Sequence, residues 1–302
     1  MSKKIGVVML SRVDRGVLFM LVSALISALN GAIAKILSED ISALEIVFFR
    51  NLLGVLFLLV MLRHTPTKLP GGKIHLLILR GLLGFSAMIL FFYTITTIPL
   101  GVAITLNKTS PLFVSVLAFF LLKEQLSRKG VAALLIGFIG VVLITKPIGL
   151  VFSYEHFLGI LGGFFAAAAY TTIKKIKHIY DARVIVLSFM TTGTLFPLFL
   201  FLIAPYVAAP EAVAFLFVDF RLPDSVKLWT LILLIGVIST LSQWLLTKAY
   251  SLSKAGVIGV VSYTNIPFAI GFGYMLGDAF PDFWTFCGIG LIVLGGVLVK
   301  KG

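Results

Sequence analysis

Long apolar stretches follow one another along the chain, separated by short polar links. A helix needs roughly 20 residues to cross about 30 Å of hydrocarbon. Ten stretches approach this length, at residues 16–37, 42–62, 74–96, 99–122, 129–146, 155–174, 184–206, 227–247, 254–277 and 281–299. The pattern predicts an all-α integral membrane protein with ten transmembrane helices.

Two of these stretches contain a proline beside a run of polar residues. Pro111 follows the run 107–110 in the fourth stretch, and Pro267 follows the run 262–265 in the ninth. Proline removes a backbone donor, so the carbonyl oxygens of Asn107 and Tyr263 should be freed. In hydrocarbon such groups persist only where they face protein or a water-filled cavity. We therefore predict broken helices, hinged at the two prolines.

The two halves of the chain share short matches at a nearly constant offset. Gly101-Val102 matches Gly256-Val257, Pro111 matches Pro267, and 140–144 resembles 295–299, at offsets of 155 or 156 residues. Three such matches indicate duplication, which predicts two five-span repeats, 1–147 and 155–302. An odd number of spans inverts the second copy in the membrane. The substrate site is then expected at the repeat interface near the midplane.

Composition and charge exclude a soluble protein and predict an orientation. Hydrophobic residues make up 60% of the 302 residues, charged residues 12%, and the mean hydropathy is +1.12. With the N-terminus inside, 18 of the 25 Lys and Arg residues lie in cytoplasmic segments and 3 in external ones. Both termini should be cytoplasmic, in a bacterial inner (plasma) membrane. The net charge of +13 thus reflects topology, and no nucleic-acid partner is expected.

Four further cations lie within the spans. Inserting a charged side chain at the bilayer centre costs roughly 2.5–3.5 kcal/mol on insertion scales, so such a residue usually faces a cavity or a partner. Lys108 lies in the broken fourth span, and Arg50 lies about 12 Å into the second. We predict both as substrate ligands, with a structural ion pair or bonds to freed carbonyls as the alternatives. Arg80 and Lys35 lie nearer span ends, where we expect them to extend toward the headgroups.

Other polar side chains complete the predicted substrate site. Asn30 needs partners in mid-membrane, while Gln243 and Trp244 offer a hydrogen bond and an aromatic wall. Tyr93 carries a phenol that seeks a polar partner when buried. The remaining candidates flank the predicted breaks: Asn107, Tyr263 and Asn265. For Asn30 and Gln243, hydrogen bonding between helices is the alternative.

The sequence contains no pattern typical of an enzyme or a metal site. It has neither a phosphate-binding glycine loop nor a zinc-spaced cluster, and its four histidines lie near span ends. The single cysteine, Cys287, cannot form an internal disulfide. We therefore expect no catalysis, no metal and no cofactor.

Several motifs together resemble a known family. They are Phe48-Phe49-Arg50, Arg80-Gly81-Leu82-Leu83-Gly84, Asn107-Lys108-Thr109-Ser110-Pro111-Leu112-Phe113, Leu122-Lys123-Glu124-Gln125-Leu126 and the glycines Gly130, Gly137 and Gly140. On the basis of these motifs, nearly the whole chain resembles the drug/metabolite transporter superfamily, in its ten-span form with two EamA-type repeats. The resemblance implies a permease for small organic solutes, while its motifs say little about which solute.

These observations predict a secondary transporter that moves a small organic metabolite by alternating access. Cations in the spans favour a solute with a carboxylate or phosphate, such as an amino acid or a nucleotide-like molecule, over a lipophilic cation. The alternative is a membrane-embedded lipid-translocating, receptor or scaffold protein without a small soluble substrate. A monomer is the simplest expectation, and the sequence leaves an oligomer, the direction of transport and ion coupling open.

Overall fold

The computed structural model describes residues 14–67, 69–98, 100–125, 127–145, 153–275 and 280–300, and these ranges contain helices and no strand. The helices are α2 (Arg15–Leu37), α3 (Ala43–His64), α4 (Ile74–Thr97), α5 (Leu100–Asn107), α6 (Ser110–Leu122), α7 (Arg128–Thr145), α8 (Tyr154–Ile176), α9 (Ala182–Ile203), α10 (Val226–Leu252), α11 (Ala255–Ser262), α12 (Asn265–Met275) and α13 (Phe283–Lys300). Two 3-10 turns, η1 (Ala204–Tyr206) and η2 (Glu211–Leu216), lie between α9 and α10.

Among the described residues, eight helical segments are long and apolar enough to cross a membrane, two of them formed by consecutive short helices. Many large apolar side chains point outward, among them Phe120, which is 72% exposed, and Leu202, which is 64% exposed. A continuous apolar exterior suits a bilayer and would be a liability in water. The predicted class, an all-α membrane protein, is therefore confirmed.

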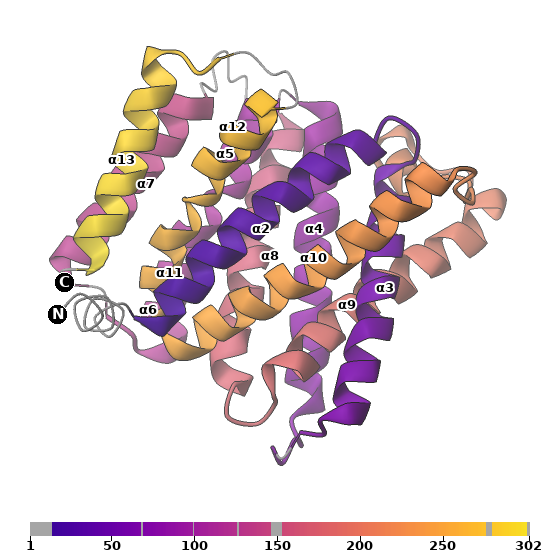
Figure 1. Cartoon of the computed structure of the whole chain (residues 1–302), viewed down its shortest axis with the longest axis horizontal. Coiled ribbons are helices and arrows are strands. Elements are labelled where there is room, and N and C mark those ends of the chain that lie inside the picture. The colour runs from indigo at the N-terminus through magenta and orange to yellow at the C-terminus, as the bar shows by residue number, and fades with distance from the viewer. Residues whose placement is uncertain are drawn as a thin grey trace, which may run out of the picture.

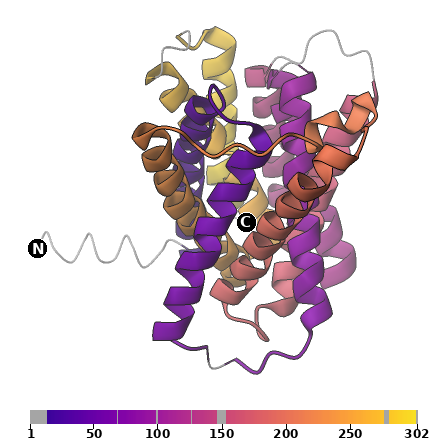
Figure 2. The ribbon, with the colours of Figure 1, turned by 90° about the vertical axis from the view of Figure 1, so that its right-hand side faces the viewer.

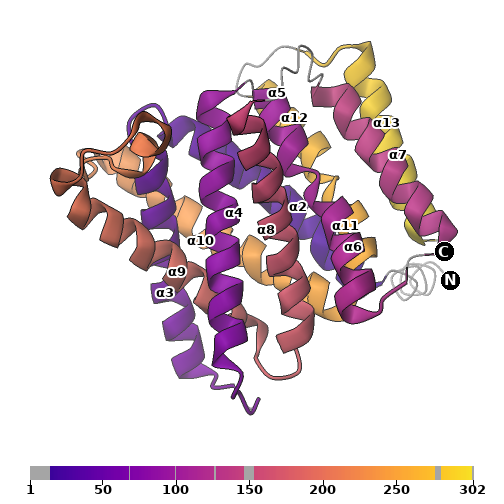
Figure 3. The same cartoon turned by 180° about the vertical axis from the view of Figure 1, so that it is seen from behind.

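The helices form pairs that join the two halves of the chain. α2 lies along α10 on one face of the bundle (Figure 1), and α4 lies along α8 on the opposite face (Figure 3). α3 packs on α9, and α7 packs on α13. Each pair contains one helix from residues 1–147 and one from 155–302, so the halves interdigitate.

The α7–α13 pair depends on glycines that let the two backbones touch. A methyl group added at Gly140 would lie 2.6 Å from the carbonyl oxygen of Gly288, and one added at Gly288 would lie 2.6 Å from that of Gly140. Both distances are far below van der Waals contact. Any side chain at either position would therefore push the helices apart.

Glu45 fixes the beginning of α3 and the long link beside it. Its carboxylate accepts the N–H and hydroxyl of Ser42 in a capping box, at 2.8 and 2.7 Å, and the N–H of Arg221 at 2.7 Å. Figure 2 shows the link that contains Arg221 running across this end of α3. Both carboxylate oxygens of this buried residue are thus occupied by structural bonds.

Each of the two polar runs interrupts its helix. α5 ends at Asn107 and α6 begins at Ser110, while α11 ends at Ser262 and α12 begins at Asn265. The expectation that Pro267 frees the carbonyl oxygen of Tyr263 was wrong. That oxygen accepts the N–H of Ile266 at 3.0 Å, because the chain closes a tight turn at the break.

Candidate functional site

The two helix breaks, residues 107–111 and 262–267, lie against each other in a region that we call the crossing. α11 packs on α6, and a methyl group added at Gly259 would lie 3.2 Å from the ring of Pro111. Glycine at 259 therefore lets the two broken helices approach closely. On the other side of the first break, a methyl group at Gly163 of α8 would lie 2.6 Å from the hydroxyl of Thr109.

Polar side chains connect the two breaks directly. The ammonium of Lys108 donates to Oδ1 of Asn265 at 3.4 Å, and Nδ2 of Asn265 donates to the carbonyl oxygen of Ala24 in α2 at 3.0 Å. No ion pair joins Lys108 to a carboxylate in the described part of the chain. One cation and one amide, from opposite halves of the chain, thus meet where both helices are interrupted.

Tyr263 and Asn107 also belong to the crossing. Tyr263 is fully buried, and its ring fills the space beside Gly137, where a methyl group would lie only 2.8 Å from a ring carbon. Its hydroxyl has no hydrogen-bond partner among the described residues. Asn107 is half-buried at the end of α5, and Pro267 occupies the first turn of α12.

Three predicted site residues lie on the α2–α10 pair. Nδ2 of Asn30 donates to the hydroxyl of Ser239 at 2.5 Å, so the alternative of an interhelical bond describes Asn30. Oε1 of Gln243 and Nε1 of Trp244 are buried without a partner in the described part of the structure. The Trp244 ring lies 6.5 Å from that of Phe19, centroid to centroid.

The two remaining candidates lie on other helices. Arg50 is on α3, and its Nε is buried without a partner among the described residues. Its neighbour Asn51 donates to the carbonyl oxygen of Val47 at 2.8 Å and lies against Gly193 of α9. Tyr93 is buried toward the end of α4.

The expectation that Arg80 extends toward the headgroups was wrong. Its side chain is 1% exposed, and its guanidinium lies 5.0 Å from the centre of the Phe189 ring. The sequence contained one signal for this, because Gly84 lies one turn later on α4. A methyl group at Gly84 would lie 2.3 Å from Nη1 of Arg80, so glycine there leaves room for an inward guanidinium.

A second unpredicted feature, which we call the Glu124 bridge, ties three helices together at one end of the bundle. Glu124 follows α6 and pairs with Lys174 of α8 at 2.8 Å. It also accepts the N–H of Ala255, the first residue of α11, at 2.8 Å. The sequence marked Glu124 only as part of a motif, because its two partners are distant in the chain.

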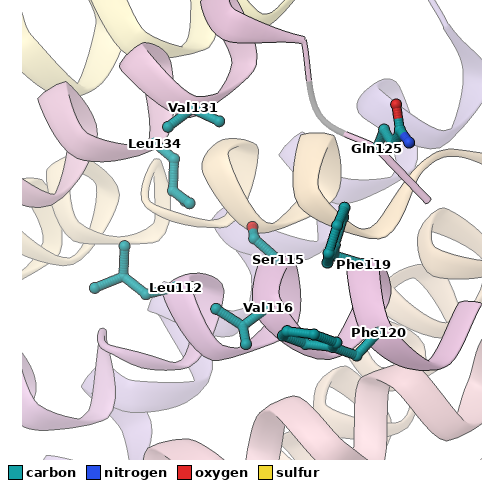
Figure 4. Close-up of a pocket in the computed structure, with 8 residues that line it drawn as sticks. All are labelled: Leu112, Ser115, Val116, Phe119, Phe120, Gln125, Val131 and Leu134. Atoms are coloured by element: carbon teal, nitrogen blue, oxygen red, sulfur yellow. The ribbon is translucent and has the colours of Figure 1, made fainter. Parts of the chain in front are cut away.

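A lateral groove of about 580 Å³ lies between α6 and α7 (Figure 4). Its wall is mainly apolar, with Ser115 and Gln125 as the polar members, and is formed by Leu112, Ser115, Val116, Phe119, Phe120, Gln125, Val131 and Leu134. Phe119 and Phe120 are exposed on the outside of the bundle, so the groove faces the surrounding lipid.

Comparison with known proteins identifies the family. The EamA-like transporter family matches residues 14–146. An uncharacterized transporter of Helicobacter pylori is 34% identical over 289 residues, which cover 94% of both chains. The chain belongs to the EamA-like transporter family.

Two further comparisons concern a named relative and the fold. The pseudopaline exporter CntI of Pseudomonas aeruginosa is 30% identical over 291 residues, covering 95% of this chain and 96% of that one. A crystal structure at 14% identity aligns over 96% of both chains with a TM-score of 0.75, which shows the same fold. The predicted resemblance is thus confirmed, and the protein is a multi-pass membrane transporter and not an enzyme.

Proposed function

We propose that this protein is a secondary transporter that moves a small organic metabolite bearing a carboxylate or phosphate by alternating access. The observation that carries the proposal is the contact between Lys108 and Asn265 at the crossing. In secondary transporters, interrupted helices commonly form the substrate site near the midplane. A membrane-embedded ammonium that has no carboxylate partner among the described residues favours a negatively charged group on the solute. Its relative CntI is named as an exporter of pseudopaline, which supports a small organic substrate.

We further propose ten spans arranged as two inverted repeats, 1–147 and 155–302. In chain order, α2, α3, α4, α5–α6 and α7 correspond to α8, α9, α10, α11–α12 and α13. If each helix is replaced by its counterpart in the other half, a packed pair should become another packed pair. The α2–α10 pair becomes α8–α4, the α3–α10 pair becomes α9–α4, and the α5–α8 pair becomes α11–α2. In each of these pairs the two helices pack against each other. The α3–α9 and α7–α13 pairs map onto themselves. This pattern supports a pseudo-two-fold axis through the crossing.

One end of the bundle is held together by bonds that alternating access would have to break. The Glu124 bridge joins α6, α8 and α11, and Lys177 donates to the carbonyl oxygen of Ser251 at 2.8 Å, joining α8 to α10. Asp14 accepts a bond from the hydroxyl of Ser253, which joins α2 to the same end. The positive-inside rule assigns this end and both termini to the cytoplasm.

The replacement Lys108→Gln tests the proposed site. It keeps the length of the side chain and deletes the charge, so the binding of an anionic solute should weaken by about 1–3 kcal/mol. Solute affinity is measured on purified, folded protein, with Lys129→Gln, which removes an exposed cation at the beginning of α7, as the matched control. Unchanged affinity and flux in folded Lys108→Gln would remove Lys108 from the site.

The lateral groove favours a second candidate function, the translocation of a lipid. Its mainly apolar wall between α6 and α7 suits an acyl chain, and Ser115 and Gln125 offer polar contacts. Vesicles with a fluorescent lipid in one leaflet separate the two functions. Lipid movement without solute flux would favour this candidate, and the reverse result supports the solute transporter.

A further inference from the structure

Arg80 is a buried cation with unused hydrogen-bond donors. Neither Nε nor Nη1 has a partner in the described part of the structure, and the side chain is 1% exposed. A guanidinium carries five N–H donors and stays protonated in proteins. The ring of Phe189 offers one cation–π contact at 5.0 Å, which compensates only part of the cost of removing the charge from water.

The helices around Arg80 carry few carboxylates. The sequences of α4 and α9, which lie beside the guanidinium, contain no Asp or Glu, and neither does α10. On α8, which packs along α4, the only carboxylate is Glu155 in the first turn, and it accepts the hydroxyl of Ser153. The ion pairs between the described residues, Lys174–Glu124 and Arg183–Asp181, do not involve Arg80. On α3 the only carboxylate is Glu45, whose two oxygens are occupied by its cap. A counter-charge must therefore come from outside this part of the protein.

Other unused donors surround the same apolar cluster, which consists of Leu58, Val186, Phe189 and Met190 and is called the Phe189 cluster below. Trp244 packs against this cluster, and its indole N–H is buried without a partner among the described residues. Indole and guanidinium groups donate hydrogen bonds and accept none. Gln243 precedes Trp244 on α10, and its Oε1 is also buried without a partner among the described residues.

The surroundings of Arg80 hold it in place without a ligand. The hydroxyl of Ser188 on α9 donates to the carbonyl oxygen of Leu77 at 2.5 Å, three residues before Arg80 on α4. Gly81 lets the two helices approach, since a methyl group there would lie 2.4 Å from the hydroxyl of Thr192. A guanidinium that is fixed before binding loses little conformational entropy when an anion arrives.

We propose that Arg80 binds the anionic group of the transported solute, a carboxylate or a phosphate, beside the Phe189 cluster, with the indole N–H of Trp244 as a neighbouring donor. The planar guanidinium suits two parallel bonds to such a group. This inference rests on the proposed transport function and specifies the substrate class. It adds Arg80 to Lys108 as a second cation that recognises the charge of the solute.

The test measures anion binding to the purified full-length protein by its thermal unfolding. The probes are two matched pairs, succinate with succinamide and AMP with adenosine, so that each pair differs mainly in its charge. We expect at least one anion to raise the Tm of the wild type while its uncharged counterpart has no effect. Arg80→Gln should weaken that binding at least tenfold, and Arg128→Gln, which removes an exposed arginine at the beginning of α7, should not.

The Tm of the ligand-free variants shows whether Arg80 binds the solute or stabilises the fold. Removing an uncompensated buried charge should leave the Tm of Arg80→Gln equal to or above that of the wild type. Arg80→Lys keeps the charge without the planar fork, and we expect it to fold and to bind the anion more weakly. The proposal is overturned if Arg80→Gln or Arg80→Lys binds the anion like the wild type, or if the wild type ignores both anions.

Flux measurements distinguish this inference from the proposed function. If the anion binds in an Arg80-dependent manner but vesicles containing the protein show no solute flux, the transporter proposal fails and the Arg80 site stands. If the anion is transported equally well by the wild type and Arg80→Gln, the Arg80 site fails and the transporter proposal stands.

Discussion

Replacing Glu124 by Gln should open the end of the bundle that the Glu124 bridge holds together. The carboxylate pairs with Lys174 at 2.8 Å, where the two side chains are 23% and 7% exposed, and it accepts the N–H of Ala255. Gln keeps an acceptor for Ala255 and loses the ion pair. A charged hydrogen bond contributes about 1.5–3 kcal/mol, and partial exposure lowers the expected loss to about 1–2 kcal/mol.

That loss shifts the equilibrium between the closed and open ends by about 5- to 30-fold. A cysteine at position 247 reports the shift, because Thr247 is fully buried on α10 in the closed arrangement. The native cysteine is first removed by Cys287→Ser, since it is the chain's single cysteine. The rate of labelling by a membrane-impermeant maleimide then measures the open population, and Glu124→Gln should raise it by the same factor.

Asp181→Asn is the matched control for this experiment. It breaks the 3.0 Å ion pair between Asp181 and Arg183, which lies within one turn at the beginning of α9. We expect its labelling rate to match that of the starting protein. The reasoning is refuted if Glu124→Gln leaves the labelling rate unchanged, or if Asp181→Asn raises it equally.

Three further predictions follow from the packing, the topology and the crossing. Gly288→Ala should lower the free energy of unfolding by about 1–3 kcal/mol, because its methyl group would meet the facing backbone at 2.6 Å; chemical denaturation of the purified protein measures this. Cysteines introduced beside Lys177 should be labelled only from the cytoplasm and those beside Asp40 only from outside, and labelling from one side would contradict the ten-span arrangement. In a double-mutant cycle of solute binding, Lys108→Gln and Asn265→Ala should couple by about 0.5–1.5 kcal/mol, since their bond is long at 3.4 Å, and additive effects would argue against a shared site.

The elements of the fold that depend on local chemistry could be predicted from the sequence. The expected breaks at Pro111 and Pro267 coincide with the ends of α5 and α11, because proline acts on the turn that precedes it. The length of the apolar stretches and the composition also predicted the membrane class. The hydrogen bond from Ile266 to the carbonyl oxygen of Tyr263 could not be predicted from the sequence, because the tight turn at the break depends on how α12 packs.

The sequence predicted how deep the polar side chains lie in the membrane better than it predicted the direction in which they point. Arg80 lies near a span end, and depth alone favoured an outward side chain, whereas the structure turns it inward above Phe189. Asn30 and Asn265 find partners on other helices, which the sequence cannot identify without the packing. The Glu124 bridge was missed for the same reason, because its partners follow 50 and 131 residues later.

Solute flux in proteoliposomes tests the central claim most directly. Purified protein reconstituted into vesicles is given pooled radiolabelled anionic and zwitterionic metabolites, beside vesicles without protein and vesicles containing Lys108→Gln. The account predicts saturable accumulation or exchange of at least one solute with a carboxylate or phosphate, lost or strongly reduced in the variant. Flux confined to uncharged or cationic solutes, or equal flux through wild type and Lys108→Gln, would contradict it.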